Sequence, residues 1–127
     1  MTATKIAHSD TRHTETPNAS MTTLASPTQG GTGTLSLWRV TMRPGQSGPL
    51  HTFDVEQVWH VLEGAATIVV DTESITLAVG DTLVLPAGTP RQIRTDSGAA
   101  FVVSGPATGR AALPDGTGDP VAPAWIV

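Results

Sequence analysis

Apolar and polar residues alternate along most of the chain, and this alternation predicts β-strands. The segment 34–42, TLSLWRVTM, is the clearest case: Leu35, Leu37, Arg39 and Thr41 share one face, and Ser36, Trp38, Val40 and Met42 share the other. Further strands are predicted at residues 21–25, 51–53, 57–64, 65–71, 75–81, 82–86, 91–95 and 99–105. A turn at Glu63-Gly64 is predicted to separate two of them.

No window shows the three-to-four-residue apolar spacing of an amphipathic helix. The chain holds 13 Gly and 10 Pro, residues that helix interiors tolerate poorly and that turns between strands use. Eight to ten short strands separated by turn signals predict an all-β sandwich or small barrel. A length of 127 residues is sufficient for one domain with a single core.

The two ends of the chain lack this pattern. Residues 1–16 are polar and aperiodic, so we expect an N-terminal arm that contributes no core element, with His8 and His13 in solvent. The domain itself is predicted to span residues 17–127. Its final residues, Trp125, Ile126 and Val127, are expected either to add an edge strand or to pack on the outside.

Charge and composition narrow the range of partners. The net charge is −4, and the seven Lys and Arg residues are scattered singly, so no basic stripe is present to bind nucleic acid. The chain has no cysteine, which removes disulfides, thiolate metal sites and cysteine nucleophiles. The first 20 residues show no apolar signal-peptide core, and no apolar run approaches the length of a membrane span. We predict a cytoplasmic protein with no membrane partner.

Two blocks of the sequence each place glycines, proline or polar residues at characteristic intervals. The first block is GQSGPLHTFDVEQVWHVLEG, with Gly45, His51, Phe53, Gln57 and Gly64. The second block is GDTLVLPAGTPR, with Gly80, Pro86, Gly88 and Arg91. This spacing resembles the two motifs of the cupin superfamily, in particular its small single-domain members, over residues 45–91. The resemblance implies a double-stranded β-helix, also called a jelly-roll barrel, for residues 17–127.

The same resemblance places four metal-ligand positions on this chain, and three of them are changed. His51 matches the first histidine, but Phe53 and Arg91 replace two other histidines and Gln57 replaces a glutamate. Any divalent metal would have only His51 and Gln57 as ligands, beside a fixed positive charge. We therefore expect no cofactor, and a metal held by an unusual ligand set stays as an alternative.

Without a metal, the resemblance implies an aromatic cavity with three convergent polar groups. His51 is the candidate acid or base, and Gln57 and Arg91 are the candidates for binding an oxyanion or carboxylate. Each has an alternative role: His51 hydrogen-bonding Gln57 without chemistry, and Arg91 forming a salt bridge with Asp54 or Glu56. The predicted substrate-binding residues are Phe53, Trp59, Ile93, Trp38 and Met42.

The first functional hypothesis is a metal-independent enzyme acting on a small molecule, namely an isomerase, epimerase, cyclase or lyase. The alternative is a binding module without catalysis, and the third hypothesis is a metal-dependent dioxygenase or lyase. His60 is expected on the outer face, because it alternates with Gln57, Trp59 and Val61. By analogy with the family we expect a homodimer, for which the C-terminal residues 125–127 are the candidate interface.

Overall fold

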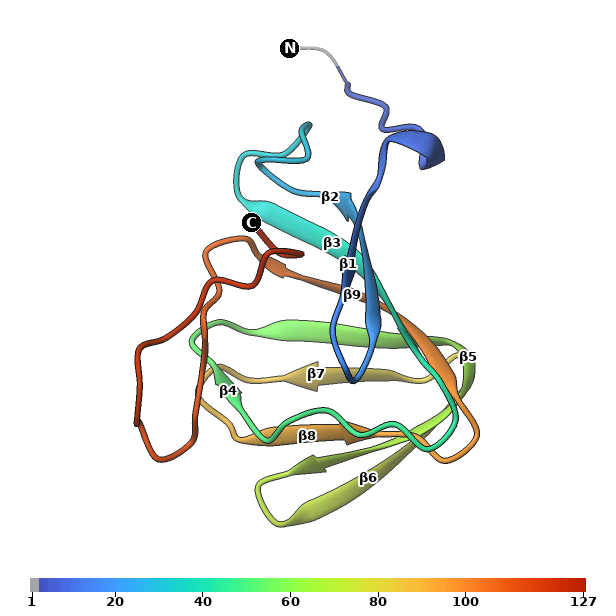
Figure 1. Ribbon diagram of the computed structural model, residues 1–127, viewed down its shortest axis with the longest axis vertical. Coiled ribbons are helices and arrows are strands. Elements are labelled where there is room, and N and C mark those ends of the chain that lie inside the picture. The colour runs from blue at the N-terminus through green and yellow to red at the C-terminus, as the bar shows by residue number, and fades with distance from the viewer. Residues whose placement is uncertain (1–2) are drawn as a thin grey trace.

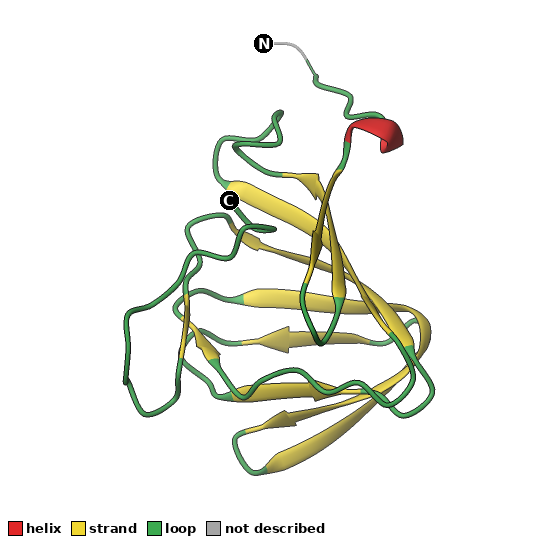
Figure 2. Cartoon of the chain, viewed as in Figure 1, coloured by secondary structure: helices red, strands yellow, loops and turns green. Residues whose placement is uncertain are grey.

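The computed structural model describes residues 3–127, and ten strands account for most of its regular structure (Figures 1 and 2). One short 3₁₀ helix, η1 (His8–Asp10), precedes them. The strands are β1 (Arg12–Glu15), β2 (Ser20–Ala25), β3 (Leu35–Met42), β4 (Thr52–Phe53), β5 (Gln57–Val70), β6 (Glu73–Ala78), β7 (Thr82–Leu85), β8 (Arg91–Arg94), β9 (Ala99–Pro106) and β10 (Ala111–Ala112).

All the strand pairs are antiparallel. The main sheet runs β1-β2-β3-β9-β5-β6, with β7 and β8 also paired to β5, and β4 pairs with β10. Strand β3 pairs with β9 over its whole length, from Leu35 opposite Pro106 to Met42 opposite Ala99. The sheet curls until β8, below β5 in Figure 1, lies across from the β1–β2 hairpin. This arrangement confirms the predicted all-β jelly-roll barrel.

Strand β5 is the longest strand and joins the two halves of the barrel. Its first half pairs with β7 and β9, and its second half pairs with β6 and β8. The change occurs at Gly64, whose φ is 72°. A Cβ at this position would lie 2.0 Å from the Gly98 oxygen, so only glycine fits. The predicted turn at Glu63-Gly64 is therefore wrong: these residues bend one continuous strand.

Part of the predicted N-terminal arm is also a strand. Residues Arg12–Glu15 form β1 and pair with β2, with Arg12 opposite Thr23 and Glu15 opposite Ser20. The segment lacks apolar residues because, at the edge of the sheet, its side chains alternate between half-buried and exposed rather than entering the core. Residues 12–15 thus add an edge strand to the sheet, which the sequence did not indicate, but none of their side chains is buried.

The core lies inside the curled sheet, and the alternation of β3 supplies one wall. Trp38, Val40 and Met42 are buried, together with Ser36, as the predicted face of this strand requires. From the paired strand β9, Phe101 and Val103 are fully buried. Fully burying a side chain of this size contributes roughly 1.5–3 kcal/mol. The β3–β9 pair thus contributes a large part of the buried core.

The C-terminal segment packs into the barrel rather than outside it. Ile126 is fully buried, and Trp125 packs on the core cluster. Hydroxyl groups of β2 and the turn after it hold this segment: Thr23 donates to the Trp125 oxygen (2.7 Å) and Ser26 to the Val127 oxygen (2.8 Å). The prediction of an edge strand or an exterior interface at residues 125–127 is therefore wrong.

Within residues 3–127, no helix has the length and apolarity needed to cross a membrane.

Candidate functional site

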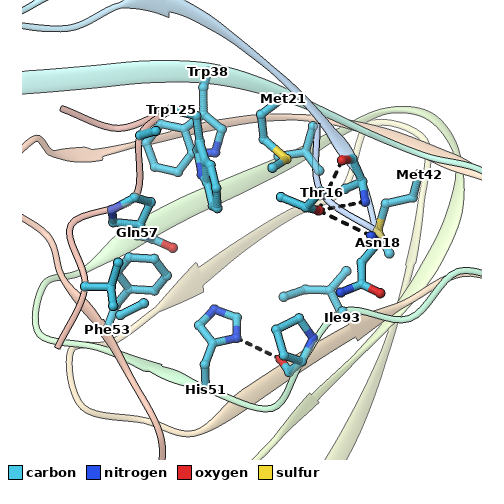
Figure 3. Close-up of a pocket in the computed structure, with 18 of the residues that line it drawn as sticks. Thr16, Asn18, Met21, Trp38, Met42, His51, Phe53, Gln57, Ile93 and Trp125 are labelled. Atoms are coloured by element: carbon cyan, nitrogen blue, oxygen red, sulfur yellow. Dashed lines mark hydrogen bonds between the residues drawn. The ribbon is translucent and has the colours of Figure 1, made fainter. Parts of the chain in front are cut away.

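A cavity of about 500 Å³ opens inside the barrel (Figure 3). Strands β2, β3, β5 and β8, the segment leading into β4, and the C-terminal segment all contribute to its wall. Its lining residues are Thr16, Asn18, Ala19, Met21, Trp38, Val40, Met42, Gly48, Pro49, His51, Phe53, Gln57, Trp59, Ile93, Ala111, Val121, Ala122, Pro123, Ala124 and Trp125. Among these residues, His51 has the only side chain that titrates near neutral pH.

His51 lies just before β4, opposite Arg91 of β8. Two backbone hydrogen bonds join these residues, at 3.0 Å from His51 N to Arg91 O and 2.9 Å from Arg91 N to His51 O. The His51 side chain points into the cavity (Figure 3), and its ring meets Phe53 edge-on with centroids 5.3 Å apart. The ring position therefore depends on both strand pairing and aromatic packing.

The protonation state of His51 follows from its surroundings. Its Nδ1 lies 2.8 Å from the Pro49 oxygen. A carbonyl only accepts, so Nδ1 carries the hydrogen, and the neutral ring keeps its lone pair on Nε2. Burial lowers the pKa of His51 below 6.5, the nearby charge of Arg91 lowers it further, and the Pro49 hydrogen bond opposes both. The neutral form with a basic Nε2 is thus favoured at pH 7.

Gln57 is buried at the first position of β5 and connects two other predicted site residues. Its Oε1 accepts from Trp59 Nε1 at 3.2 Å and from Arg91 Nη1 at 3.4 Å. No hydrogen bond joins Gln57 to His51 in the described part of the chain, contrary to one alternative from the sequence. With its oxygen engaged, Gln57 can offer its amide N–H groups to the cavity.

Arg91 is fully buried, yet it is not part of the cavity lining. Its Nη2 donates to the Pro86 oxygen and its Nε to the Thr89 oxygen, both at 3.0 Å. The guanidinium carbon lies 5.6 Å from the centroid of Phe53, and it is Phe53 that faces the cavity. Burial lowers the pKa of Arg91, but a guanidinium stays charged at physiological pH.

This placement changes the predicted role of Arg91. It was expected to bind a substrate oxygen directly, but its donors point to backbone carbonyls and to Gln57. The alternative salt bridge with Asp54 or Glu56 is wrong: in residues 3–127 the ion pair formed is Arg39–Glu63, at 3.4 Å. Arg91 instead holds a positive charge behind the cavity wall.

The five residues predicted to bind substrate all line the cavity. They are Phe53, Trp59, Ile93, Trp38 and Met42. Trp59 also packs edge-on against Phe101, with centroids 5.2 Å apart, which fixes its indole against the core. Their role in binding stays a prediction, but their position gives the cavity a wall built mainly from aromatic and aliphatic side chains.

Sequence reasoning missed two parts of the lining. One is the β1–β2 turn, where Thr16 and Asn18 face the cavity, and the other is the segment 121–125. Both lie in stretches without strand periodicity, so pattern gives no sign of their position. The bulky apolar Trp125 in a polar tail was the one available signal.

Two of the three histidines outside the cavity have a side-chain partner. His60 Nδ1 lies 2.7 Å from Thr82 Oγ1, and His60 faces away from the cavity, as the alternation of its strand predicts. His13 Nδ1 lies 3.1 Å from Thr22 Oγ1, and His8 is exposed in η1. None of the three is near His51 in the lining, so they add no ligand or base to it.

The residues present do not fit a divalent metal. Of the four positions, Phe53 has no donor atom and Arg91 is a cation. The Gln57 oxygen already accepts from Trp59 and Arg91, which leaves His51 Nε2 as the single free donor. No cluster of three His, Cys, Asp or Glu residues that could hold a metal occurs in the described chain.

Comparison with known proteins identifies the domain type. The family model described as "Cupin domain" matches residues 38–104, a span that contains both glycine-rich blocks. A search of curated proteins finds no match.

Several solved structures are similar in fold. The polyketide cyclase RemF from Streptomyces resistomycificus is 21% identical with a TM-score of 0.70, over 83% of this chain and 80% of that one. A sugar phosphate isomerase of the cupin superfamily from Silicibacter pomeroyi is 27% identical with a TM-score of 0.61, over 73% and 64%. Salicylate 1,2-dioxygenase from Pseudoaminobacter salicylatoxidans is 24% identical with a TM-score of 0.66, over 74% of this chain and 26% of that one.

Proposed function

This chain belongs to the cupin family, and we propose that it binds a small molecule inside the barrel and transfers a proton of that molecule through His51. The proposal is carried by the protonation state and the orientation of the His51 ring. His51 is the one side chain of the lining that titrates near neutral pH, and its Nδ1–H is held by the Pro49 oxygen while its ring faces the cavity. A neutral imidazole in that position is suited to act as a general base.

The proposed reaction begins at a carbon next to a carbonyl. His51 Nε2 removes the proton from that carbon, and the electron pair of the broken C–H bond moves into the carbonyl to form an enolate. The Pro49 oxygen stabilises the resulting imidazolium, while burial and the Arg91 charge favour return of the proton. Once the Nε2 proton has exchanged with solvent, its return to the original carbon gives hydrogen exchange, and its delivery to another position gives isomerisation. Attack of the enolate carbon on a second carbonyl carbon of the same molecule, whose oxygen then takes the proton, gives cyclisation. Departure of a leaving group from the β-carbon with its bonding pair gives elimination.

Gln57 is the proposed donor to the enolate oxygen. Its Oε1 accepts from Arg91 Nη1, and a cation bound to the oxygen of an amide makes the amide N–H groups stronger donors. Stabilising an oxyanion with a fixed donor in an apolar cavity is the expected use of such a group. Arg91 then acts through Gln57, so it is a positioning residue rather than a direct contact of the substrate.

A binding module without catalysis remains the second candidate. One observation favours it: His51 is a single proton carrier, and no second acid or base lines the cavity. A cavity of this kind is sufficient to carry or sense a small molecule. The two candidates differ in one measurable property, which is proton exchange on a bound ketone.

The test uses 2-tetralone, an uncharged ketone with acidic α-protons, in D₂O. We expect the protein to accelerate deuterium incorporation, measured by ¹H NMR, and H51A to lose the acceleration by about 100-fold or more. The control is H60A, which removes a histidine outside the cavity and should exchange like the wild type. Chelator treatment should not change the rate.

Three outcomes of this test are informative. Equal rates in wild type and H51A would overturn the role of His51. Saturable binding of 2-tetralone without exchange would favour the binding module. Loss of exchange on chelation, with recovery on adding one metal, would overturn the metal-independent mechanism.

We also propose that the protein forms a homodimer through the outer face of its main sheet. Leu37, Ser104, Val58 and Val84 are register neighbours across four strands, β3, β9, β5 and β7. Leu37, Val58 and Val84 are 38%, 37% and 53% exposed, and an exposed apolar row of this kind is typical of a contact surface.

The cytoplasmic location and the absence of a nucleic-acid partner stay predictions from composition.

A further inference from the structure

We infer that the cavity selects uncharged, planar molecules of largely aromatic character with a hydroxyl or carbonyl group at one edge, and that it rejects phosphates and carboxylates. This inference deepens the proposed function and rests on it for the part played by His51. It is carried by the charges, the walls and the polar atoms of the cavity.

The cavity has no cation to receive an anion. Its lining contains no Lys or Arg, and no Asp or Glu. The nearest buried cation, Arg91, donates to two carbonyls and to Gln57 and has no exposed surface. His51, whose pKa is lowered by burial, is neutral near pH 7. A phosphate or carboxylate in the cavity would therefore lose much of its hydration without gaining a cationic partner, which is strongly unfavourable.

The walls favour flat rings. Trp38, Phe53, Trp59 and Trp125 surround the cavity (Figure 3 labels three of them), and aliphatic and thioether side chains fill the spaces between them. Aromatic side chains pack well against the faces and edges of other rings. The volume of about 500 Å³ lies within the range of roughly 300–1,000 Å³ that accommodates drug-sized molecules.

Polar atoms are too few for a polyhydroxylated ligand. Apart from the indole groups, polar side chains of the lining come from Thr16, Asn18, His51 and Gln57. Thr16 Oγ1 is already engaged: it accepts from the backbone N–H groups of residues 18 and 19 and donates to the Ala19 oxygen. A sugar would leave most hydroxyls unpaired, whereas one hydroxyl or carbonyl can be satisfied by His51 or Gln57.

The tryptophans make this selectivity measurable. The chain has three Trp residues, and all of them, Trp38, Trp59 and Trp125, line the cavity. Intrinsic fluorescence therefore reports on the cavity, with calorimetry as a second readout. The probes are 2-naphthol, 2-naphthyl phosphate and glucose 6-phosphate. We expect saturable binding of 2-naphthol. We expect affinities for both phosphates that are lower by about 100-fold or more, because their charge is buried without a cationic partner.

A gain-of-function variant tests whether the lack of a cation causes the rejection of phosphates. Asn18 lies at a turn on the cavity wall, so N18K supplies the missing cation on a flexible side chain. We expect N18K to raise the affinity for 2-naphthyl phosphate by about tenfold or more. The matched control is H60K, which adds the same charge on the outer face and should leave the phosphate affinity unchanged.

Equal binding of 2-naphthol and 2-naphthyl phosphate by the wild type would overturn the inference. Unchanged phosphate affinity in a folded N18K would overturn its electrostatic basis. These binding measurements require no turnover, so they are separate from the exchange test: selective binding without His51-dependent exchange supports the ligand class and contradicts the catalytic proposal. His51-dependent exchange together with preferred binding of phosphates supports the catalytic proposal and contradicts the ligand class.

Discussion

His51 combines a half-buried ring with one fixed hydrogen bond. The Pro49 carbonyl determines which nitrogen carries the hydrogen, and the barrel wall determines that the other nitrogen faces the cavity. Neither effect is encoded by the residue type alone. The same histidine in solvent would titrate near 6.5 and would exchange tautomers freely.

This environment predicts a specific pH dependence. The pKa of His51 in the folded protein is lowered, so its basic form should persist below pH 6.5, and an NMR titration of its Cε1 proton should give a midpoint below that of a free histidine. The unfolded chain binds this proton more readily, so the stability contributed by His51 is complete above pH 6.5 and is lost as the pH falls through the lowered pKa. H51Q should remove this part of the acid destabilisation in urea titrations. An NMR titration midpoint at or above pH 6.5 would contradict the lowered pKa of His51.

Arg91 lies behind the cavity lining and has a structural role there. Its guanidinium gives donors to the oxygens of Pro86, Thr89 and Gln57 inside the barrel. Removing it leaves several buried acceptors without partners, and each such loss costs about 1–3 kcal/mol.

We therefore expect R91M to lower the free energy of unfolding by about 2–4 kcal/mol in urea denaturation. The neighbouring R94M replaces an exposed arginine and should change stability by less than about 0.5 kcal/mol. A loss below about 1 kcal/mol in R91M would show that the buried hydrogen bonds are replaced by water, with the cavity then reaching Arg91.

At the scale of the element, strand β5 depends on one glycine. The 14-residue strand passes from one half of the barrel to the other at Gly64, where φ is 72° and the chain touches the Gly98 carbonyl. A positive φ disfavours a side chain, and the close carbonyl forbids one. The turn predicted from Glu63-Gly64 correctly located a break in pattern but not its form.

Comparing two glycines separates these causes. G64A should destabilise the protein by at least about 2 kcal/mol, because backbone strain and the clash with the Gly98 oxygen add together. Gly80 has a similar positive φ of 89° but no atom within 4 Å of an added Cβ, so G80A should cost about 1 kcal/mol from strain alone. Thermal and urea unfolding measure both, and equal losses would mean that the contact with Gly98 relaxes freely.

The C-terminal segment is the other element that matters for the site. Residues 121–125 form one wall of the cavity, and the burial of Ile126 holds them against the barrel. Thr23 and Ser26 secure the same segment by hydrogen bonds to its backbone oxygens. Access to the cavity and the shape of its wall therefore depend on a stretch of chain that has no strand pattern.

At the scale of the whole molecule, the exposed apolar row of the main sheet predicts self-association. Light scattering coupled to size exclusion should give the mass of a dimer for the wild type. The double variant V58E/V84E places like charges on neighbouring strands of this face and should shift the protein to the monomer. The control, V79E, changes a 62% exposed residue in the turn after β6 and should not. A monomeric wild type would contradict the proposed dimer.

The sequence by itself determined the fold class and most of the strands. Alternation in β3 separated its two faces, and the resemblance placed Trp38 and Met42 in the cavity. The offsets of Gly45, Gly64 and Gly80 located the barrel motifs, because glycines at tight backbone positions leave a local signal. The changed ligand positions were also readable, since residue type alone decides whether a side chain can bind a metal.

The tertiary structure alone decided what surrounds those residues. Strand β1 lacks apolar alternation because it lies at an edge, and the tail enters the barrel because Ile126 fills a space that no local pattern describes. Arg91 shares the inward face of its strand with Ile93, as alternation predicts. The direction of its long side chain, away from the cavity and onto backbone carbonyls, depends on atoms brought together from distant parts of the chain. That long-range contact is why the site is an apolar cavity with one base rather than a pocket with an open cation.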